Sequence, residues 1–348
     1  MTRTITCAQA ICEATAQEME RDPQVVVIGQ GVDDFKGFVG TTKDLVQRFG
    51  HDRVMDTPLS EDGMTGVAIG MALAGMRPIH THIRMDFMLL AMNQIVNIAA
   101  KSRYMFGGAV KLPLTIRTVI GRSWGQGAQH SQGLHSLVAH IPGLKVVAPS
   151  TPFDAKGCLA ASIRDDNPVV FVEHRMAHLC KGIVPEEPYT VPLGKARVLA
   201  EGSHVTLVGV SYMAVECLRA AHKLAGIGIS AEVIDPVTLN PLDIETIVES
   251  VRKTRHLVVV DTAWLFCGLS AEIIAQVTEQ LQGQTDIRVA RQGYAPVPCP
   301  TTKNLENLFY ANAQTVAAAA FRLVRPNETS WEPPYEESPE IIEFKGPF

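Results

Sequence analysis

An acidic residue at the head of a small-residue helix is the strongest chemical signal in this sequence. In TPLSEDGMTGVAIGMALAG (57–75), Glu61 and Asp62 stand directly before a run of glycines, alanines and small aliphatic residues. Acidic side chains near a helix N-terminus gain ~0.3–1 kcal/mol from the helix dipole, which accounts for them without a function. A carboxyl in this place could also face a ligand and share a proton with it. The residues alone favour the dipole explanation.

The same predicted helix carries a stripe of very small residues. Gly66, Gly70 and Ala74 recur at a spacing of four, so they lie on one helix face. Each helical glycine costs ~0.5–1 kcal/mol relative to alanine. The stripe predicts close approach of another helix, in this chain or in another subunit, although ordinary helix–sheet packing is equally compatible with it.

Several histidines could also take part in chemistry. His80 and His82 alternate on a predicted strand, so their side chains share one face. Two histidines at this spacing resemble metal ligands, but no third ligand follows at a suitable distance. A hydrogen-bonded or site-lining role is therefore favoured over metal binding.

Composition limits the classes of function. The 348 residues are 46% hydrophobic and 19% charged, with a net charge of −5 and no basic block, which argues against nucleic acid as a partner. No apolar run reaches the ~18 residues of a membrane span, and the N-terminus lacks a signal-peptide layout. The seven cysteines are odd in number and form no CxxC pair, so neither disulfides nor zinc are expected. A cytoplasmic protein is predicted.

Alternating strands and helices predict two α/β domains. Apolar strands are expected at 25–29, 77–83, 112–120, 145–150 and 168–174, with helices near 41–49, 63–75, 86–105 and 152–165. Near-continuous apolar strands separated by helices are typical of parallel sheets covered on both faces. The alternation restarts after a proline-rich stretch. The predicted divisions are a domain at 1–181, a linker at 182–198, a second domain at 199–326, and an acidic, proline-rich tail at 327–348 that is extended or partly disordered.

Three motifs in order identify a family resemblance. The string E-x4-G-Φ-x-x-G-Φ, beginning at Glu61, resembles the signature of the pyrimidine-binding domain of thiamine-diphosphate enzymes. The segments RVMDTPLSEDGMTG, AQHSQGLHSLVAHIPGLKVVAPSTPFDAKG and SIRDDNPVVFVEH resemble the β subunit of the decarboxylase component of 2-oxo acid dehydrogenase complexes, from about residue 5 to 325. Pyruvate dehydrogenase and branched-chain 2-oxo acid dehydrogenase are members. The resemblance implies a pyrimidine-binding domain followed by a transketolase C-terminal-like domain, both with mainly parallel sheets flanked by helices.

The resemblance assigns roles to residues of the cofactor site. Glu61 corresponds to the acid that hydrogen-bonds the pyrimidine ring nitrogen of thiamine diphosphate and so favours the imino tautomer. Phe87 corresponds to the aromatic contact of the aminopyrimidine, with an ordinary core aromatic as the alternative, and Leu59 is assigned to the same cofactor site. Leu90 departs from the glutamine common in pyruvate dehydrogenases, which makes the local pocket more apolar.

Two further roles are implied away from the pyrimidine. His130, in AQHSQ, corresponds to a histidine that reaches the thiazolium side, binds the substrate carboxylate or an intermediate and helps proton transfer; a structural loop histidine is the alternative. In the family a loop binds a monovalent cation, potassium, through backbone carbonyls. The matching residues are Leu114, Ser162, Ile163, Asp165 and Asn167, and a plain helix C-terminal turn is the alternative.

A missing motif implies a partner. The sequence has no GDG followed by asparagine at a suitable distance, the motif that holds the diphosphate through magnesium. The resemblance therefore implies an α subunit that brings magnesium, an α2β2 heterotetramer, and acyl transfer from a 2-oxo acid to lipoyl-lysine of an acyltransferase core. An acetoin dehydrogenase β subunit and the C-terminal half of a split transketolase remain alternatives, as does a scaffold subunit without chemistry. The sequence does not name the substrate.

Overall fold

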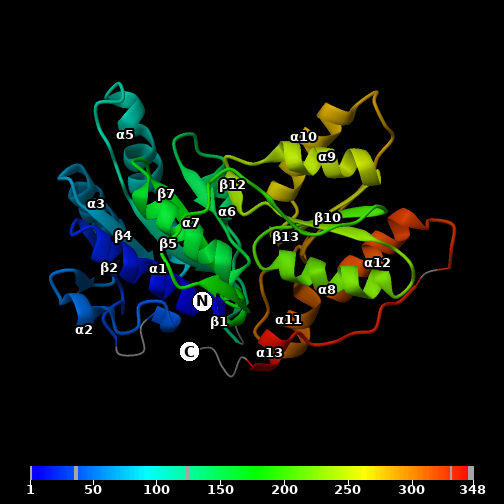
Figure 1. The fold of residues 1–348 in the computed structure, drawn as a ribbon, viewed down its shortest axis with the longest axis horizontal. Coiled ribbons are helices and arrows are strands. Elements are labelled where there is room, and N and C mark those ends of the chain that lie inside the picture. Colours follow the sequence, from blue (N-terminus) through cyan, green and yellow to red (C-terminus); the bar gives the residue numbers. More distant parts are fainter. Residues whose placement is uncertain (1, 35–37, 123–124, 330, 344–348) are drawn as a thin grey trace. The chain divides into compact units, whose positions relative to one another are not determined.

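The computed structural model describes residues 2–34, 38–122, 125–329 and 331–343, and the chain forms two compact units. Unit 1 comprises residues 1–121 and 137–193, and unit 2 comprises residues 122–136 and 194–348 (Figure 1). Each unit has a mainly parallel sheet flanked by helices. This arrangement confirms the predicted fold class.

Unit 1 is built on parallel strands in the order β6-β7-β5-β4-β2-β3, with a separate antiparallel pair of β1 and β8. Its strands are β1 (Thr2–Thr6), β2 (Val25–Gly29), β3 (Val54–Asp56), β4 (Arg77–His82), β5 (Thr115–Ile120), β6 (Lys145–Val147), β7 (Val169–His174) and β8 (Lys181–Pro185). Every residue of β2, β5 and β7 is buried, as expected of strands in a sheet covered on both faces.

The helices of unit 1 begin where the sequence supplies capping groups. The helical segments are α1 (Cys7–Arg21), η1 (Phe38–Gly40), α2 (Leu45–Phe49), α3 (Glu61–Leu73), α4 (Met85–Met88), η2 (Leu89–Ala91), η3 (Asn93–Ala99), α5 (Ala100–Met105), α7 (Pro152–Arg164) and η5 (Ala177–Leu179), with α6 (His135–Ala139) at the division between the units. Thr6 and Gln9 form a capping box at α1, and Thr151 caps α7 ahead of a proline. Helix α1 packs against α7, and α3 packs against β4 and η3.

The helix predicted at 86–105 is not one regular helix. The chain passes from α4 through the 3-10 turn η2 and the seven-residue π-helix η3 into α5. Hydrophobic periodicity gives no sign of such changes, because it reports the buried face and not the hydrogen-bond register. Irregular turns of this kind often occur at functional sites.

Unit 2 has the sheet order β14-β13-β10-β11-β9, in which only β9 is antiparallel to its neighbour. Its elements are η4 (Gly127–Gln129), β9 (Arg197–Ala200), β10 (Val205–Gly209), α8 (Met213–Ala225), β11 (Ala231–Asp235), β12 (Thr238–Asn240), α9 (Ile244–Thr254), β13 (His256–Trp264), α10 (Leu269–Leu281), β14 (Arg288–Tyr294), α11 (Lys303–Phe309), α12 (Ala313–Val324) and α13 (Pro339–Glu343). Helices α9 and α10 cover one face of the sheet, and α8 and α12 cover the other (Figure 1).

The divisions of the chain differ from the predicted ones at 181 and 198. Residues 182–185 of the predicted linker belong to β8, which pairs with β1 in unit 1, and unit 2 resumes at Gly194. The segment 122–136 packs with unit 2, although it was expected inside a continuous domain at 1–181. Its contacts are side-chain bonds to residues distant in sequence, which periodicity does not reveal.

In its described part the acidic tail contacts unit 2: residues 331–338 have no regular secondary structure, as expected of an extended arm, and residues 339–343 form α13. Glu336 pairs with Lys223 at 3.0 Å, and Glu340 pairs with Arg219 at 2.6 Å. The Tyr212 hydroxyl donates to Ser338 Oγ at 3.1 Å. The acidic side chains are thus neutralised by a basic face of α8. Residues 330 and 344–348 of the tail lie outside the described part.

No helix in the described ranges is long and apolar enough to cross a membrane.

Candidate functional site

A small pocket in unit 1 brings together two of the predicted cofactor residues. Its lining includes Glu61, Met64, Ile83 and Phe87. Glu61 belongs to α3, which precedes β4 in the chain, and Phe87 belongs to α4, which follows the carboxyl end of β4. The carboxyl ends of parallel strands are where ligands bind in open α/β sheets.

Glu61 is the first residue of α3, and its backbone lies at the positive end of a 13-residue helix. The helix has no side-chain cap from Ser60, which also lines the pocket. The dipole of α3 therefore favours a negative charge or a hydrogen-bond acceptor at this spot. Asp62 also lies in the first turn of α3, but it does not line the pocket. Only Glu61 of the two acids is therefore placed to contact a ligand there.

A chain of hydrogen bonds lies behind Glu61. Thr65, one helical turn after Glu61, is fully buried, and its Oγ1 lies 3.1 Å from Nε2 of His80 and 3.2 Å from Nε2 of His82. Nδ1 of His80 lies 3.3 Å from the carbonyl oxygen of Ile28. Both histidines are hydrogen-bonded, which was one of the two predicted roles, and both line the pocket.

Burial keeps both imidazoles neutral. It lowers the pKa of His80 to about 4, a shift that the bond to the Ile28 carbonyl only partly opposes. Burial also lowers the pKa of His82 well below its usual value, and the nearby His80 adds to this effect. The described residues contain no group of three or more histidine, cysteine, aspartate or glutamate side chains that could hold a metal ion.

The other predicted cofactor residues lie differently. Phe87 is half-buried and lines the pocket beside Glu61, as a ring-stacking contact requires. Leu59 is 83% exposed and outside the pocket lining, although its neighbours Pro58 and Ser60 belong to it. Leu90 is also exposed and outside the lining, so it does not make this pocket more apolar. A contact between Leu59 and the cofactor stays a prediction.

His130 belongs to unit 2, on the segment 122–136. It follows the 3-10 turn η4 and is half-buried. The segment is fixed at both ends. Arg122 Nη2 donates to Oδ1 of Asn307, and Nε2 of His135 lies 2.9 Å from Oδ1 of Asp261. These two contacts tie the segment that carries His130 to unit 2, and sequence reasoning did not predict them.

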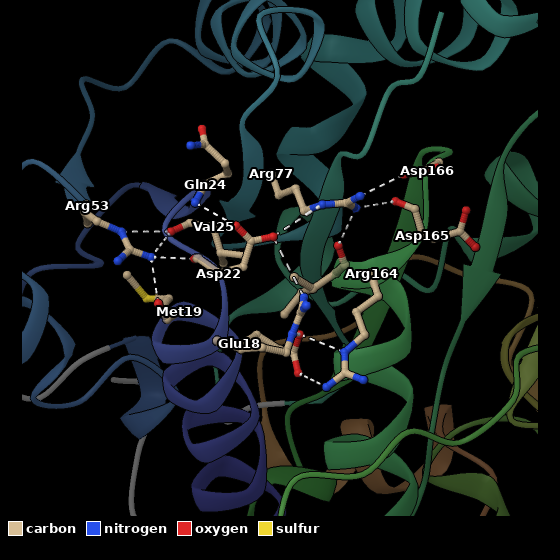
Figure 2. Close-up of polar contacts among 12 residues, drawn as sticks. Glu18, Met19, Asp22, Gln24, Val25, Arg53, Arg77, Arg164, Asp165 and Asp166 are labelled. Carbon is tan, nitrogen blue, oxygen red and sulfur yellow. Dashed lines mark hydrogen bonds and ion pairs between the residues drawn. The ribbon is translucent and has the colours of Figure 1, made fainter.

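Arg77 donates hydrogen bonds to the loop that was predicted to bind a monovalent cation. Arg77 Nη1 donates to the carbonyl oxygens of Ile163 and Asp165, each at 3.1 Å, while its Nη2 pairs with Asp166 at 2.8 Å (Figure 2). The Ser162 oxygen accepts the N–H of Asp165 at 3.2 Å.

The remaining two predicted cation ligands are also engaged. The Leu114 oxygen accepts the N–H of Val169 at 2.9 Å, and the side-chain amide of Asn167 donates to Oδ1 of Asp165 at 2.9 Å. Four of the five predicted residues thus have a carbonyl that already accepts one hydrogen bond. A guanidinium group holds two of these oxygens, so a positive charge already lies on this face of the loop.

Sequence reasoning singled out Glu61, Phe87 and the histidine pair but missed Thr65. The available signal was its spacing of four from Glu61, which places both on one face of α3. It also missed the role of Arg77, which it placed only at the start of the strand predicted at 77–83.

Comparisons with known proteins agree with this architecture. The family described as transketolase, pyrimidine binding domain, matches residues 3–179, and the family described as transketolase, C-terminal domain, matches residues 194–316. A split-gene transketolase, described as an inactive β4 tetramer, has a TM-score of 0.74, with 24% identity over 92% of this chain and 98% of that chain. At this identity the likeness shows the fold alone.

Relatives with higher identity carry two kinds of names. The β subunit of acetoin:2,6-dichlorophenolindophenol oxidoreductase from Cupriavidus necator is 43% identical over 335 residues, covering 93% of this chain and 99% of that protein. The pyruvate dehydrogenase E1 component subunit β from Rickettsia conorii is 42% identical, covering 90% and 97%. The mitochondrial E1 subunit β from Dictyostelium discoideum is 40% identical, covering 94% and 93%. The chain therefore belongs to the family of two-domain, transketolase-like β subunits that includes those of pyruvate dehydrogenase E1 components and acetoin oxidoreductases.

Proposed function

We propose that this chain is the β subunit of a thiamine-diphosphate-dependent 2-oxo acid dehydrogenase, which decarboxylates a 2-oxo acid oxidatively and passes the acyl group to lipoyl-lysine of an acyltransferase. The observation that carries the proposal is the pairing of Glu61 with Phe87 in one small pocket at the N-terminus of α3. A carboxyl and an aromatic side chain that line the same pocket fit an aminopyrimidine, because the ring offers a face for stacking and a nitrogen for hydrogen bonding.

Each residue of the pocket has a separate task in this proposal. Thiamine diphosphate, when bound, supplies the carbanion that attacks the 2-oxo acid. Glu61 holds a proton at the pyrimidine ring nitrogen, and the dipole of α3 holds the carboxylate oxygens in place. Phe87 orients the ring through its face. Leu59 is assigned to the rim of the same site, where its 83% exposed side chain is free to cover a ligand.

His130 is proposed to bind the substrate carboxylate and to transfer protons near the reacting carbon. A half-buried imidazole on a segment fixed by Arg122 and His135 supports this role, because a proton carrier needs a defined position and contact with solvent. The proposal is tested by His130→Asn, which keeps a hydrogen-bonding side chain of similar size and removes proton transfer. A large fall in kcat with cofactor affinity retained is expected.

A second chain is proposed to complete the site. The outer face of α3 is left open, because Gly70 and Ala74 are exposed, and Val67 and Leu73 are 48% and 50% exposed. A Cβ atom added to Gly70 would meet no atom of the described residues. An open, small-residue, apolar face is typical of a subunit contact. We propose that an α subunit packs there in an α2β2 heterotetramer and holds the diphosphate and magnesium.

We also propose that the loop 162–167 binds a potassium ion that shares carbonyl oxygens with Arg77. A carbonyl oxygen has two lone pairs, so each oxygen that already accepts one N–H can accept a second contact. Arg77, however, already donates to the Ile163 and Asp165 oxygens and places a positive charge there. An ion would have to share these oxygens with the guanidinium. Thermal unfolding in potassium, sodium and choline chloride at equal ionic strength tests this, and a potassium-specific rise in Tm is expected.

The central experiment is the Glu61→Gln variant of the assembled enzyme. Glutamine keeps the size of the side chain but cannot share a proton, so kcat on a 2-oxo acid should fall at least 100-fold while the subunits still assemble. Asp62→Asn is the matched control, since Asp62 shares the helix terminus but not the pocket, and it should keep near-normal activity. Full activity of Glu61→Gln would overturn the proposal.

Acetoin is the second candidate substrate class, because two relatives with 43% and 40% identity are acetoin:2,6-dichlorophenolindophenol oxidoreductase β subunits. Turnover on pyruvate, branched-chain 2-oxo acids and acetoin, each with the same α subunit, separates the two. Turnover of acetoin alone would replace the leading proposal.

A further inference from the structure

In the hydrogen bonds of Thr65, His80 and His82, the chemistry of the groups determines which atom donates and which accepts. The carbonyl oxygen of Ile28 can only accept, so Nδ1 of His80, 3.3 Å away, carries a proton and donates it. A neutral His80 then has no proton on Nε2. This nitrogen accepts from the Thr65 hydroxyl, which lies 3.1 Å away. The Thr65 hydroxyl has one proton, and this bond uses it.

The direction continues to the second histidine. Oγ1 of Thr65 lies 3.2 Å from Nε2 of His82, and it can only accept there because its proton is engaged with His80. Nε2 of His82 therefore carries the proton, and Nδ1 of His82 carries a lone pair. The described residues make no hydrogen bond to this Nδ1, and His82 lines the pocket that contains Glu61.

The surroundings stabilise this arrangement against protonation. The side chains of His80, His82 and Thr65 are nearly or fully buried. Burial lowers the pKa of both imidazoles, so neither gains a second ring proton near neutral pH. The rings stand edge to face with centroids 4.4 Å apart, and two positive charges at this distance would repel each other. Glu61, one turn before Thr65 on α3, is the acid that shares the pocket with His82.

We propose that His80 and Thr65 are positioning residues that fix His82 as a neutral imidazole with Nδ1 unprotonated, so that the pocket offers a hydrogen-bond acceptor to a ring ligand carrying an amino group. The inference rests on the proposed function for the identity of this ligand, the aminopyrimidine of thiamine diphosphate. Glu61 recognises a ring nitrogen, and His82 recognises an N–H donor. The two contacts together select an aminated ring over one that lacks the amino group.

The first test measures the tautomers and needs no cofactor. Long-range 1H–15N spectra of the full-length chain labelled at histidine, with His80 and His82 assigned by single substitutions, should show Nδ1–H for His80 and Nε2–H for His82 at pH 7. The Thr65→Val variant removes the hydroxyl at nearly constant volume, so the His82 signals should move toward a mixture of tautomers. Thr65→Ser keeps the hydroxyl and should preserve the wild-type spectrum. A protonated His82, or an Nδ1–H tautomer, in the wild type would overturn the proposal.

The second test measures selection of the ligand by the enzyme assembled with its α subunit. Thiamine diphosphate and its 4′-deamino analogue are titrated by the quenching of intrinsic fluorescence. One neutral hydrogen bond corresponds to about a fivefold to tenfold change in affinity. The preference for the aminated cofactor should therefore shrink by about that factor in His82→Leu and Thr65→Val, and it should persist in Thr65→Ser. An unchanged preference in both variants would overturn the proposal.

The two tests separate this inference from the proposed function. If thiamine diphosphate does not bind the assembled wild-type enzyme, the proposed function fails, and the tautomer spectra still decide the state of His82. If it binds and the preference does not depend on His82, the proposed function stands and this inference fails.

Discussion

Nε2 of His135 lies 2.9 Å from Oδ1 of Asp261, and neither side chain is exposed. This pair joins the segment 122–136 to β13 in the core of unit 2. Nearby, a Cβ atom on Gly133 would lie 1.8 Å from the carbonyl oxygen of Thr262, so only glycine allows the segment to approach the strand this closely. The position of His130 is therefore set by unit 2.

Asp261→Asn should destabilise the protein, because it weakens the buried hydrogen bond between Asp261 and Nε2 of His135. Loss of a buried hydrogen-bond partner typically costs about 1–3 kcal/mol. Urea denaturation of the full-length chain measures this cost. The control is Glu328→Gln, which removes a half-exposed ion pair to Arg325 and should cost less than about 1 kcal/mol. Equal effects of the two substitutions would contradict the importance assigned to the His135–Asp261 contact.

A buried carboxylate in unit 1 makes a second prediction. Glu173 accepts from Arg117 at 2.6 and 3.0 Å and lies 2.8 Å from Nε2 of His178, with all three side chains buried. Although burial opposes ionisation, the attraction of Arg117 and the bonds to Arg117 and His178 lower the pKa of Glu173 to about 2.

Glu173→Gln should therefore cost on the order of 3–5 kcal/mol at pH 7, since it leaves the Arg117 guanidinium buried without its counter-ion. Because the folded-state pKa is below the unfolded value of 4.5, the wild-type advantage is present above about pH 4.5 and is lost as the pH falls toward 2. Denaturant titrations of both proteins at several pH values measure this difference. Glu20→Gln, in the exposed pair with Arg48, is the matched control and should change stability by less than about 1 kcal/mol.

The histidine pair behind Glu61 predicts acid sensitivity of unit 1. The pKa of His80 is about 4 in the folded protein, below its usual 6.5, so protons bind the unfolded chain more strongly. The contribution of neutral His80 to the free energy of unfolding is fully present above pH 6.5. It decreases by about 3 kcal/mol as the pH falls from 6.5 to about 4. Thermal unfolding between pH 7.5 and 4.5 should show this loss.

The contribution of His80 to the acid sensitivity can be isolated by substitution. His80→Gln removes the titrating group, so the loss of stability at low pH should become smaller. His51→Asn is the control for replacing an imidazole that is 78% exposed. A slope that is the same in His80→Gln and in the wild type would contradict the prediction.

Local signals were sufficient to predict most of the fold. Strand β2 was predicted at its observed bounds because four consecutive β-branched residues followed by glycine favour a short buried strand. Helix α3 was predicted two residues late, because the acids at its start carry no hydrophobic periodicity. The docked tail was not predicted, because its stability comes from Arg219 and Lys223, which precede it by more than a hundred residues.

The site was predicted unevenly for a similar reason. Glu61 and Phe87 stand in motifs that the family resemblance identifies, and they meet in the pocket as expected. Thr65 and Arg77 act through contacts made only in the folded chain, and the spacing of Thr65 from Glu61 does not reveal its histidine partners. The placement of His130 on unit 2 follows from the His135–Asp261 pair, which joins positions 126 residues apart.

Glu306, a buried acid in unit 2, should make stability fall as the pH rises, which is opposite to the effect of His80 and Glu173. Glu306 is fully buried on α11, and its carboxyl oxygens make no hydrogen bond of ordinary geometry with the described residues. Burial raises the pKa of Glu306 to about 7, although Arg122 and the backbone of Gly125 attract its charge. Cys299 and Tyr310 also lie close enough to interact with this charge. The folded protein therefore binds a proton that the unfolded chain releases near pH 4.5.

Stability should accordingly fall as the pH rises from about 4.5 to 7, because the folded state must either keep that proton or bury a charge. The penalty reaches about 3 kcal/mol above pH 7, since each tenfold difference in proton affinity corresponds to ~1.4 kcal/mol. Glu306→Gln removes the titrating carboxyl and therefore this penalty. Urea denaturation should show the variant to be more stable than the wild type at pH 8 and nearly equal at pH 5. A variant that is less stable at pH 8 than at pH 5, relative to the wild type, would show that Glu306 is charged and stabilising in the folded protein.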